Sequence, residues 1–277
     1  MTDRQRELGT EFQRLHEAPG TFIMANPPDA GSAVLLANMG FPALGTTSAG
    51  IAFQMGRADK IGALSNEEAL AEIQRIVEAA PVPVSADLEG GLGGSADEVH
   101  ATYRQAIDIG LAGGSIEDTA DDTGRALLEP EEAADRVAAA RDAIDATGRP
   151  FILTARAECY LTGHPEPFKE AMRRIHMYRD AGADCLYVPG IADPDEIREL
   201  VREAGRPINV LARLGTDPLS FDDLKALGVK RISIGSGLAR YAFKAYERAA
   251  KQMLDDGRFD FMEDTLSVGK LNKLFTG

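Results

Sequence analysis

The chain has 277 residues, of which 44% are hydrophobic, and its formal net charge at pH 7 is −14. This acidic balance argues against binding of nucleic acid, because neutralising phosphates requires a basic face. No apolar run approaches the roughly 18 residues of a membrane-spanning helix, so we expect a soluble, cytoplasmic protein that does not bind membranes.

Short apolar segments alternate along the chain with longer segments of helical periodicity. A helix is expected first, over residues 4–17. The expected strands are 21–26, 43–48, 82–87, 114–118, 151–156, 185–190, 208–213 and 231–235. The clearest helices between them are 65–80, 96–111 and 131–147. The last barrel helix is expected over 241–253, and an apolar tail follows it over 258–277.

Eight strand candidates, each followed by a helix, predict an α/β fold of the (β/α)8 or TIM-barrel type. The strand segments are almost wholly apolar, which is typical of parallel strands buried on both faces. We expect one domain over residues 1–277. A doubly wound sheet is the alternative, but the glycines at 91–94 lack the spaced fingerprint of a nucleotide-binding loop.

The cysteine and histidine content gives no sign of a zinc or disulfide framework. Cys159 and Cys185 lie at or near the ends of apolar segments, and we expect both to be small core residues. The four histidines show no ligand spacing.

Carboxylates follow two of the apolar segments at the point where each segment ends. Asp87 and Glu89 close the third strand candidate, and Glu117 closes the fourth. The carboxyl ends of barrel strands carry active sites, and neighbouring ends would bring these acids around one cation. Oxygen ligands suit Mg²⁺, or Mn²⁺ as an alternative. The other interpretation is that these acids are helix caps or solvated loop residues.

Three other strand ends could bind anions. Arg156 offers a planar fork for a carboxylate or phosphonate, although it could also form a structural ion pair with a neighbouring acid. Ser48 and the amides of Ala49, Gly50 and Ile51 could bind a second anionic group. The glycines at 235–237 could alternatively form a phosphate cup or simply relieve close packing.

Together these blocks resemble the isocitrate lyase/phosphoenolpyruvate mutase superfamily over nearly the whole chain. The blocks that carry the resemblance are NPPDAGS at 26–32, GTTSAGI at 45–51, PVSADLEGG at 83–91, SIED at 115–118, TARAE at 154–158 and RISIGSGL at 231–238. The resemblance implies a barrel whose last helix is exchanged between two subunits, usually within a homotetramer. It also implies Mg²⁺-assisted chemistry on a small 2-oxo acid through an enolate.

The resemblance also implies roles for individual residues. Asp87 would bind the metal directly, while Glu89 and Glu117 would hold metal-bound waters. Ser48, Ala49 and Gly50 would bind the oxo-acid carboxylate, and Arg156 would bind the oxo acid or its leaving portion. Asp59 would lie near the metal-bound waters, and Asn209 would contact the substrate.

The chain departs from the family pattern after the fourth strand candidate. Isocitrate and methylisocitrate lyases carry a cysteine and lysine motif there, whereas TADDTGRA at 119–126 has neither residue. The lysine gate of the carbon–phosphorus branch is missing too. These departures favour an oxaloacetate-like 2-oxo acid and a C–C lyase or decarboxylase. The alternatives are a C–P enzyme (phosphonopyruvate hydrolase, phosphoenolpyruvate mutase or carboxyphosphonate phosphorylmutase type) and a non-catalytic 2-oxo-acid binder. Residues 113–127 should include a mobile lid.

Overall fold

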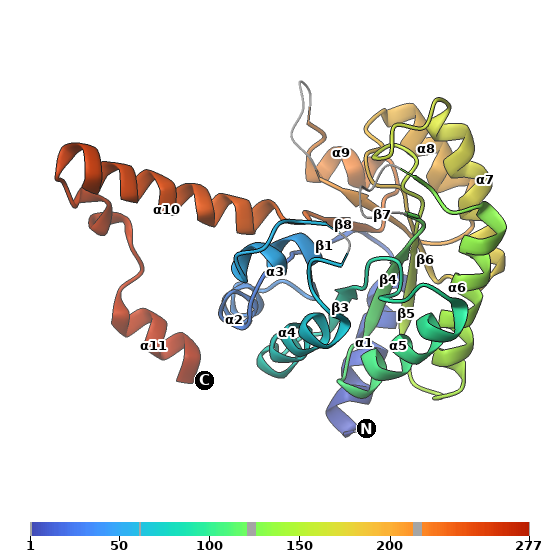
Figure 1. The fold of residues 1–277 in the computed structure, drawn as a ribbon, viewed down its shortest axis with the longest axis horizontal. Coiled ribbons are helices and arrows are strands. Elements are labelled where there is room, and N and C mark those ends of the chain that lie inside the picture. Colours follow the sequence, from blue (N-terminus) through green and yellow to red (C-terminus); the bar gives the residue numbers. More distant parts are fainter. Residues whose placement is uncertain (1, 61, 121–125, 213–217, 277) are drawn as a thin grey trace.

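The computed structural model describes residues 2–60, 62–120, 126–212 and 218–276, and it shows a (β/α)8 barrel (Figure 1). Its parallel strands are β1 (Phe22–Met24), β2 (Leu44–Gly45), β3 (Val84–Asp87), β4 (Gly113–Glu117), β5 (Ile152–Arg156), β6 (Cys185–Tyr187), β7 (Ile208–Leu211) and β8 (Arg231–Ser233). They pair in the order β1-β8-β7-β6-β5-β4-β3-β2. A single parallel bridge between Ala25 and Leu44 links the two ends of this order. The predicted fold class is therefore confirmed.

Helices surround the strands on the outside of the barrel (Figure 1). They are α2 (Ala30–Asn38), α3 (Ser48–Gln54), α4 (Asn66–Ala79), α5 (Ala96–Asp108), α6 (Pro130–Asp145), α7 (Pro167–Asp180), α8 (Pro194–Glu203) and α9 (Phe221–Ala226). Ser65 caps α4 by accepting from the Glu68 N–H, as the capping-box pattern predicts. Both cysteines are free and buried, as expected for small core residues.

The N-terminal helix α1 (Asp3–Glu17) closes the barrel at the amino ends of the strands. Phe12 is fully buried and forms one apolar cluster with Phe22, Met24, Ile152 and neighbouring small residues. The side chains of α1 therefore seal this end of the barrel, which leaves the carboxyl ends of the strands as the open face.

The second strand is shorter than the predicted segment 43–48. It ends at Gly45, because Thr47 already acts as the cap of α3 by accepting a hydrogen bond from the Gly50 N–H. A residue that caps a helix has its side chain committed to the first turn, so Ser48 lies in α3 instead of in the strand.

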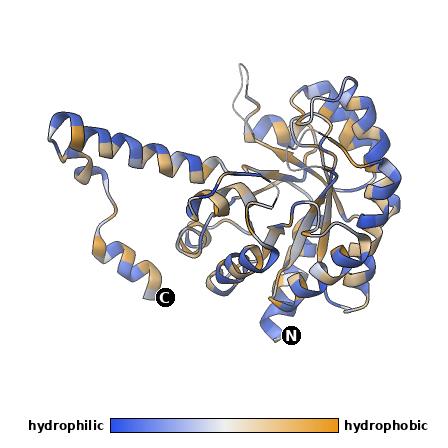
Figure 2. Cartoon of the chain, in the orientation of Figure 1, coloured by the Kyte–Doolittle hydropathy of each residue, from blue (hydrophilic) through white to orange (hydrophobic). Residues whose placement is uncertain are grey.

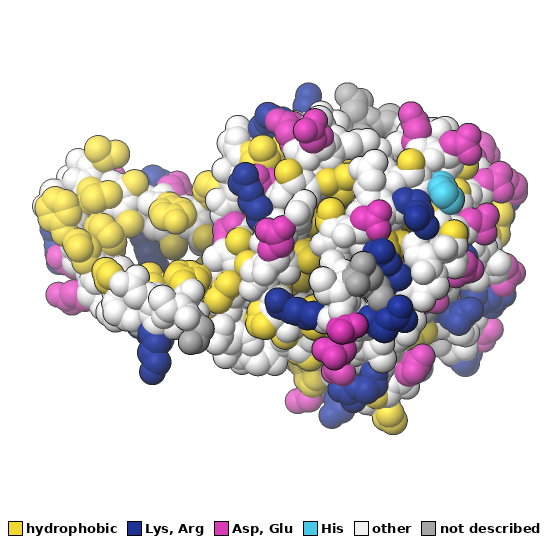
Figure 3. Space-filling model, turned by 90° about the horizontal axis from the view of Figure 1, so that it is seen from below, with side chains coloured by type: hydrophobic (Ala, Val, Ile, Leu, Met, Phe, Trp, Pro, Cys, Tyr) yellow, Lys and Arg dark blue, Asp and Glu magenta, His cyan; other side chains and the backbone are white. Residues whose placement is uncertain are grey.

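The chain ends in an arm that projects from the barrel (Figure 1). It consists of α10 (Gly237–Asp256), a 3-10 turn η1 (Asp260–Asp264) and α11 (Val268–Thr276). The helix α10 begins before the expected residue 241 and contacts α3, while α11 contacts α2. Hydrophobic residues run along the arm (Figure 2), and their side chains gather on its surface (Figure 3). Tyr241 is 73%, Tyr246 71% and Leu254 84% exposed. Within the described residues no helix is long and apolar enough to cross a membrane.

Candidate active site

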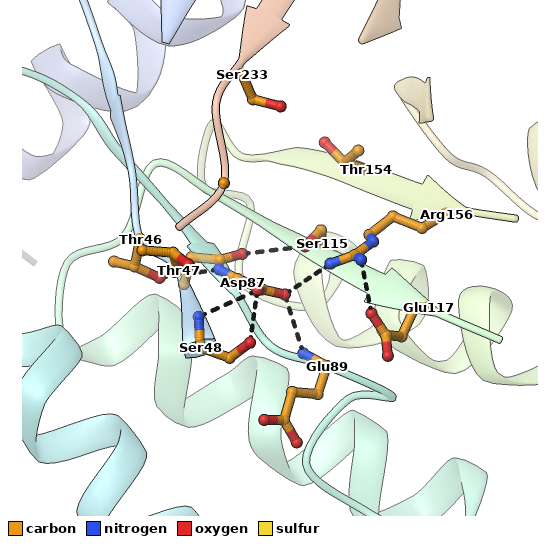
Figure 4. Close-up of polar contacts among 12 residues, drawn as sticks. Thr46, Thr47, Ser48, Asp87, Glu89, Ser115, Glu117, Thr154, Arg156 and Ser233 are labelled. Carbon is orange, nitrogen blue, oxygen red and sulfur yellow. Dashed lines mark hydrogen bonds and ion pairs between the residues drawn. The ribbon is translucent and has the colours of Figure 1, made fainter. Parts of the chain in front are cut away.

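Arg156 forms the centre of a charged cluster at the carboxyl ends of β3, β4 and β5 (Figure 4). Its Nη1 pairs with Asp87 Oδ1 at 2.9 Å and its Nη2 with Glu117 Oε2 at 3.0 Å. Its Nε pairs with Glu158 Oε1 at 2.8 Å. The register of the sheet explains the meeting, because Glu117 pairs with Arg156 across β4 and β5. All four side chains are mostly buried, so these ion pairs are poorly screened by solvent.

Asp87 also binds the first residue of α3. Its Oδ2 accepts from the Ser48 N–H at 3.2 Å and from the Ser48 hydroxyl at 2.9 Å. Its own N–H donates to Thr46 Oγ1 at 3.0 Å. The donors of Ser48, which the resemblance assigns to a substrate carboxylate, are therefore occupied by the carboxylate of Asp87.

Ala49 and Gly50 are placed differently from each other. Ala49 lines the pocket above the cluster. Gly50 is buried, its N–H donates to Thr47 Oγ1 at 3.2 Å, and a Cβ at this position would lie 2.5 Å from Thr47 Cγ2. The Gly50 amide is thus engaged by the helix cap.

The cluster holds more negative charge than Arg156 balances. Burial, followed by the charges of Asp87, Glu117 and Asp59, raises the pKa of Glu89 to about 7. Burial also raises the pKa of Glu158 to about 8, against the opposing effect of Arg156. The pKa of Asp59 is raised by burial and then by the charge of Asp87. An added cation would lower the free energy of ionising these acids.

The donor set fits a hard divalent cation. Asp87, Glu89 and Glu117 offer only carboxylate oxygens, and the Glu89 side chain points away from Arg156 (Figure 4). In the described part of the chain, no three Asp, Glu, His or Cys side chains lie close enough to hold a metal ion directly. Mg²⁺ usually takes only one or two protein carboxylates and keeps several waters. Direct binding by Asp87, with Glu89 and Glu117 reached through water, stays a prediction.

A pocket of about 350 Å³ lies over the cluster. Its polar lining includes Ser48, Asp59, Asp87, Glu117, Arg156 and Glu158. Its remaining wall contains Leu161, Pro189 and Leu211. The structure therefore places Asp59 in the same pocket as the strand-end acids Asp87 and Glu117.

Asn209 lies deeper, in the interior of the barrel. It lines a smaller hollow of about 60 Å³ together with Asp87 and Arg156. It is 1% exposed, its Nδ2 donates to Ser233 Oγ at 2.9 Å, and its Oδ1 accepts from Arg231 Nε at 2.8 Å. Arg213, which the sequence places at the same strand end, is outside the described residues.

Two further sequence predictions concern loops. The Gly235 N–H donates to Asn26 Oδ1 at 3.1 Å, so this amide of the possible phosphate cup already has an acceptor. In the expected lid, residues 113–117 form β4, and Thr119 pairs with Leu127 in an antiparallel bridge. Residues 121–125, on which the lid prediction mainly rests, are outside the described residues.

Three residues of the site were not identified from the sequence. Glu158 lies in the TARAE segment, two residues after Arg156, and that spacing indicates a place in the same site. Tyr187 places its ring 5.2 Å from the Arg156 guanidinium carbon, and no sequence signal pointed to it. Asp118 is 1% exposed and accepts from the Glu158 N–H and from Arg174 Nη1, both at 2.9 Å. It therefore supports the loop that carries Glu158.

Comparison with known proteins shows the family of the chain. The family model described as phosphoenolpyruvate phosphomutase matches residues 12–254. The chain belongs to this family. It is 31% identical to the chloroplastic carboxyvinyl-carboxyphosphonate phosphorylmutase of Arabidopsis thaliana, over 80% of this chain and 67% of that protein. It is 29% identical to the 2-methylisocitrate lyase of Salmonella typhimurium, over 81% of this chain and 76% of that protein.

The phosphoenolpyruvate phosphomutase-family fold is also seen in solved structures. A Burkholderia cenocepacia J2315 protein, named provisionally as a lyase/mutase, superposes with a TM-score of 0.94 at 45% identity. The match covers 99% of this chain and 98% of that one. The resemblance to the isocitrate lyase/phosphoenolpyruvate mutase superfamily is confirmed, and with it membership of a superfamily of lyases and mutases that act on C–C and C–P bonds.

Proposed function

We propose that the protein is a Mg²⁺-dependent lyase or decarboxylase that breaks a C–C bond in a small, oxaloacetate-like 2-oxo acid through an enolate. The observation that supports this most directly is Arg156, a buried guanidinium with three carboxylate partners beneath a 350 Å³ pocket. A planar fork suits a substrate carboxylate, and the surplus acids suit a hard divalent cation.

The chain's own residues would bind and orient the substrate. Asp87 would hold the metal directly, and Glu89 and Glu117 would hold its waters. Ser48 and Ala49 would bind the oxo-acid carboxylate once Asp87 leaves Ser48, while Arg156 would orient the portion that leaves. Mg²⁺, or Mn²⁺, would supply Lewis-acid stabilisation of the negative charge on the enolate oxygen.

The reaction must proceed without a thiol at the pocket. Burial raises the pKa of Cys159 to about 12, and Cys185 is also buried. The stretch 119–126 contains no cysteine or lysine. Decarboxylation meets this constraint, because the C–C bond breaks, CO₂ leaves with its own oxygens, and the electron pair passes to the enolate. The enolate carbon can then take its proton from water.

C–P bond chemistry is the second candidate. The names of the matching family model and of the Arabidopsis thaliana relative favour it. A protein that binds 2-oxo acids without turnover is the third, and a bound acid with no reaction would reveal it.

The test is a substrate screen with Mg²⁺. Oxaloacetate and its alkylated homologues should be consumed with release of CO₂ or of a cleaved acid, while phosphorus-31 NMR of a phosphonopyruvate incubation should show no change. Because Mg²⁺ alone can promote decarboxylation of oxaloacetate, each rate is compared with that of the metal without protein. A change in the phosphorus spectrum without consumption of the other acids would overturn C–C cleavage.

Arg156→Lys separates an active-site role from a structural one. Lysine keeps the charge but loses the fork, so kcat/KM should fall on the order of 100-fold, as expected for losing one or two charged hydrogen bonds. Arg198→Lys on the surface of α8 is the matched control and should leave kcat/KM unchanged. An unchanged rate in Arg156→Lys would remove this residue from the site.

A further inference from the structure

The pocket over the acid cluster has an apolar surface in its wall. Leu161 follows β5, Pro189 follows β6 and Leu211 ends β7, so loops and ends of three consecutive strands supply it. The acids Asp87 and Glu117 come from β3 and β4, on another part of the rim. Arg156 and Glu158 at the end of β5 also line the pocket, so a ligand bound to Arg156 would lie beside these apolar side chains.

The backbone at two glycines passes close to the two leucines. A Cβ on Gly190 would lie 3.2 Å from Leu161 Cδ2, and a Cβ on Gly235 would lie 3.4 Å from Leu211 Cδ1. Both glycines have positive φ, 94° and 52°, so each chain turn passes close beneath a leucine from the preceding strand. This apolar surface thus lies against the backbone of the barrel.

Leu161 is nevertheless 54% exposed at the pocket. Exposed hydrocarbon beside a ligand site is stabilised when a ligand covers it. The pocket volume of about 350 Å³ lies within the range of roughly 300–1,000 Å³ that accommodates drug-sized ligands. It has room for more than a four-carbon acid.

We infer that the substrate is a 2-oxo acid carrying an alkyl group, and that Leu161 and Leu211 determine this specificity by packing on that group. The inference rests on the proposed function for its oxo-acid end. Each methylene that the leucines bury is worth roughly a fourfold gain in affinity.

Binding of unreactive probes tests the inference without turnover. Pyruvate, 2-oxobutanoate and 2-oxopentanoate are titrated by calorimetry into the full chain with Mg²⁺. Affinity should rise about fourfold with each added methylene, and Leu161→Ala and Leu211→Ala should each reduce that gain. Val77→Ala on the outer helix α4 is the control and should keep the full gain. Thermal unfolding checks that all variants fold.

Two outcomes overturn the inference in distinguishable ways. Equal affinities for the three acids in the unsubstituted protein would reject the alkyl-group assignment and leave the proposed function intact. Failure of all three acids to bind would reject both. In turnover, kcat/KM for 3-propyl-oxaloacetate should exceed that for oxaloacetate at least tenfold, and Leu211→Ala should narrow the ratio.

Discussion

Asp87 and Glu89 are two positions apart, but their carboxylates have different surroundings. Asp87 contacts Arg156 and Ser48, whereas Glu89 points away from Arg156 (Figure 4). We predict that Asp87→Ala abolishes both activity and Mg²⁺ binding, and that Glu89→Ala weakens both less, because only Asp87 should touch the ion. Calorimetric titration with Mg²⁺ and steady-state rates measure the two effects. Equal, small effects would contradict the metal assignment.

His16 is a neutral histidine buried beneath the barrel. Its Nδ1 donates to the Phe12 carbonyl at 2.8 Å, and its Nε2 accepts from Arg231 at 3.2 Å. Burial, followed by the charge of Arg231, lowers its pKa to about 3. In the unfolded chain His16 takes up a proton near pH 6.5, whereas in the folded protein it stays neutral down to about pH 3. The unfolding free energy therefore decreases as pH falls from 6.5 towards 3.

His16→Gln removes this proton linkage. We predict that the unfolding free energy of the unsubstituted protein falls by about 2 kcal/mol relative to His16→Gln between pH 7 and pH 5. Urea unfolding at the two pH values measures the difference. Parallel changes in the two proteins would show that His16 is protonated in the folded state.

The sequence predicted those site residues that lie at the end of a strand. Asp87, Glu117 and Arg156 could be placed because each ends an apolar segment, and parallel strands end at one face. Asp118 also ends its expected strand, but its bond from Arg174 depends on a helix distant in sequence, and the contact of Tyr187 with Arg156 likewise could not be predicted. The Ser48–Asp87 hydrogen bonds could not be predicted for the same reason, because they join the start of α3 to the end of β3, 39 residues away.

At the scale of elements, α1 packs against the start of β5 through a glycine. A Cβ on Gly9 would collide with the carbonyl oxygen of Pro150. Gly9→Ala should therefore destabilise the protein by about 1–3 kcal/mol, although alanine favours a helix by about 1 kcal/mol. Urea unfolding measures this. Gly269→Ala in α11 is the control, because no atom lies within 4 Å of its Cβ and no loss is expected.

The order of strands and helices was predictable, whereas several element boundaries were not. Apolar runs and helical periodicity located every strand, because burial on both faces leaves a continuous signal. The predicted strand 43–48 was too long since Thr47 has a capping role that its residue type alone does not reveal. Caps and short loops shorten strands without changing the hydrophobic pattern.

At the scale of the whole molecule, both the arm and the barrel have exposed apolar surface. A groove of about 330 Å³ lies between the start of β1, the end of α2 and the start of α9, lined by residues that include Met39, Phe41 and Phe221. The arm exposes Tyr241, Tyr246 and Leu254. Exchange of the last helix between two subunits, within a homotetramer built as a dimer of helix-swapped dimers, stays a prediction, and it would cover such surfaces.

Deletion of residues 258–277 tests this assembly. We predict that the shortened chain forms a smaller oligomer, from tetramer to dimer or to aggregate, because burial at roughly 25 cal/mol per Å² makes the arm's contacts worth many kcal/mol. Light scattering measures the mass of both proteins. A monodisperse monomer for the full-length and the shortened chain would refute helix exchange and leave the arm as a cover for its own barrel.

The hydrogen bonds from Ser48 to Asp87 make the predicted metal and substrate subsites interdependent. While Asp87 occupies the Ser48 donors, a 2-oxo acid must displace a carboxylate of the protein itself. The apparent affinity for the 2-oxo acid is therefore multiplied by the fraction of molecules in which the Ser48 donors are free. A cation that draws Asp87 away would free those donors. Metal and oxo acid should therefore bind with positive cooperativity, each tightening the other by the same factor. Titration of pyruvate with and without Mg²⁺ would measure that factor, and Ser48→Ala should reduce it.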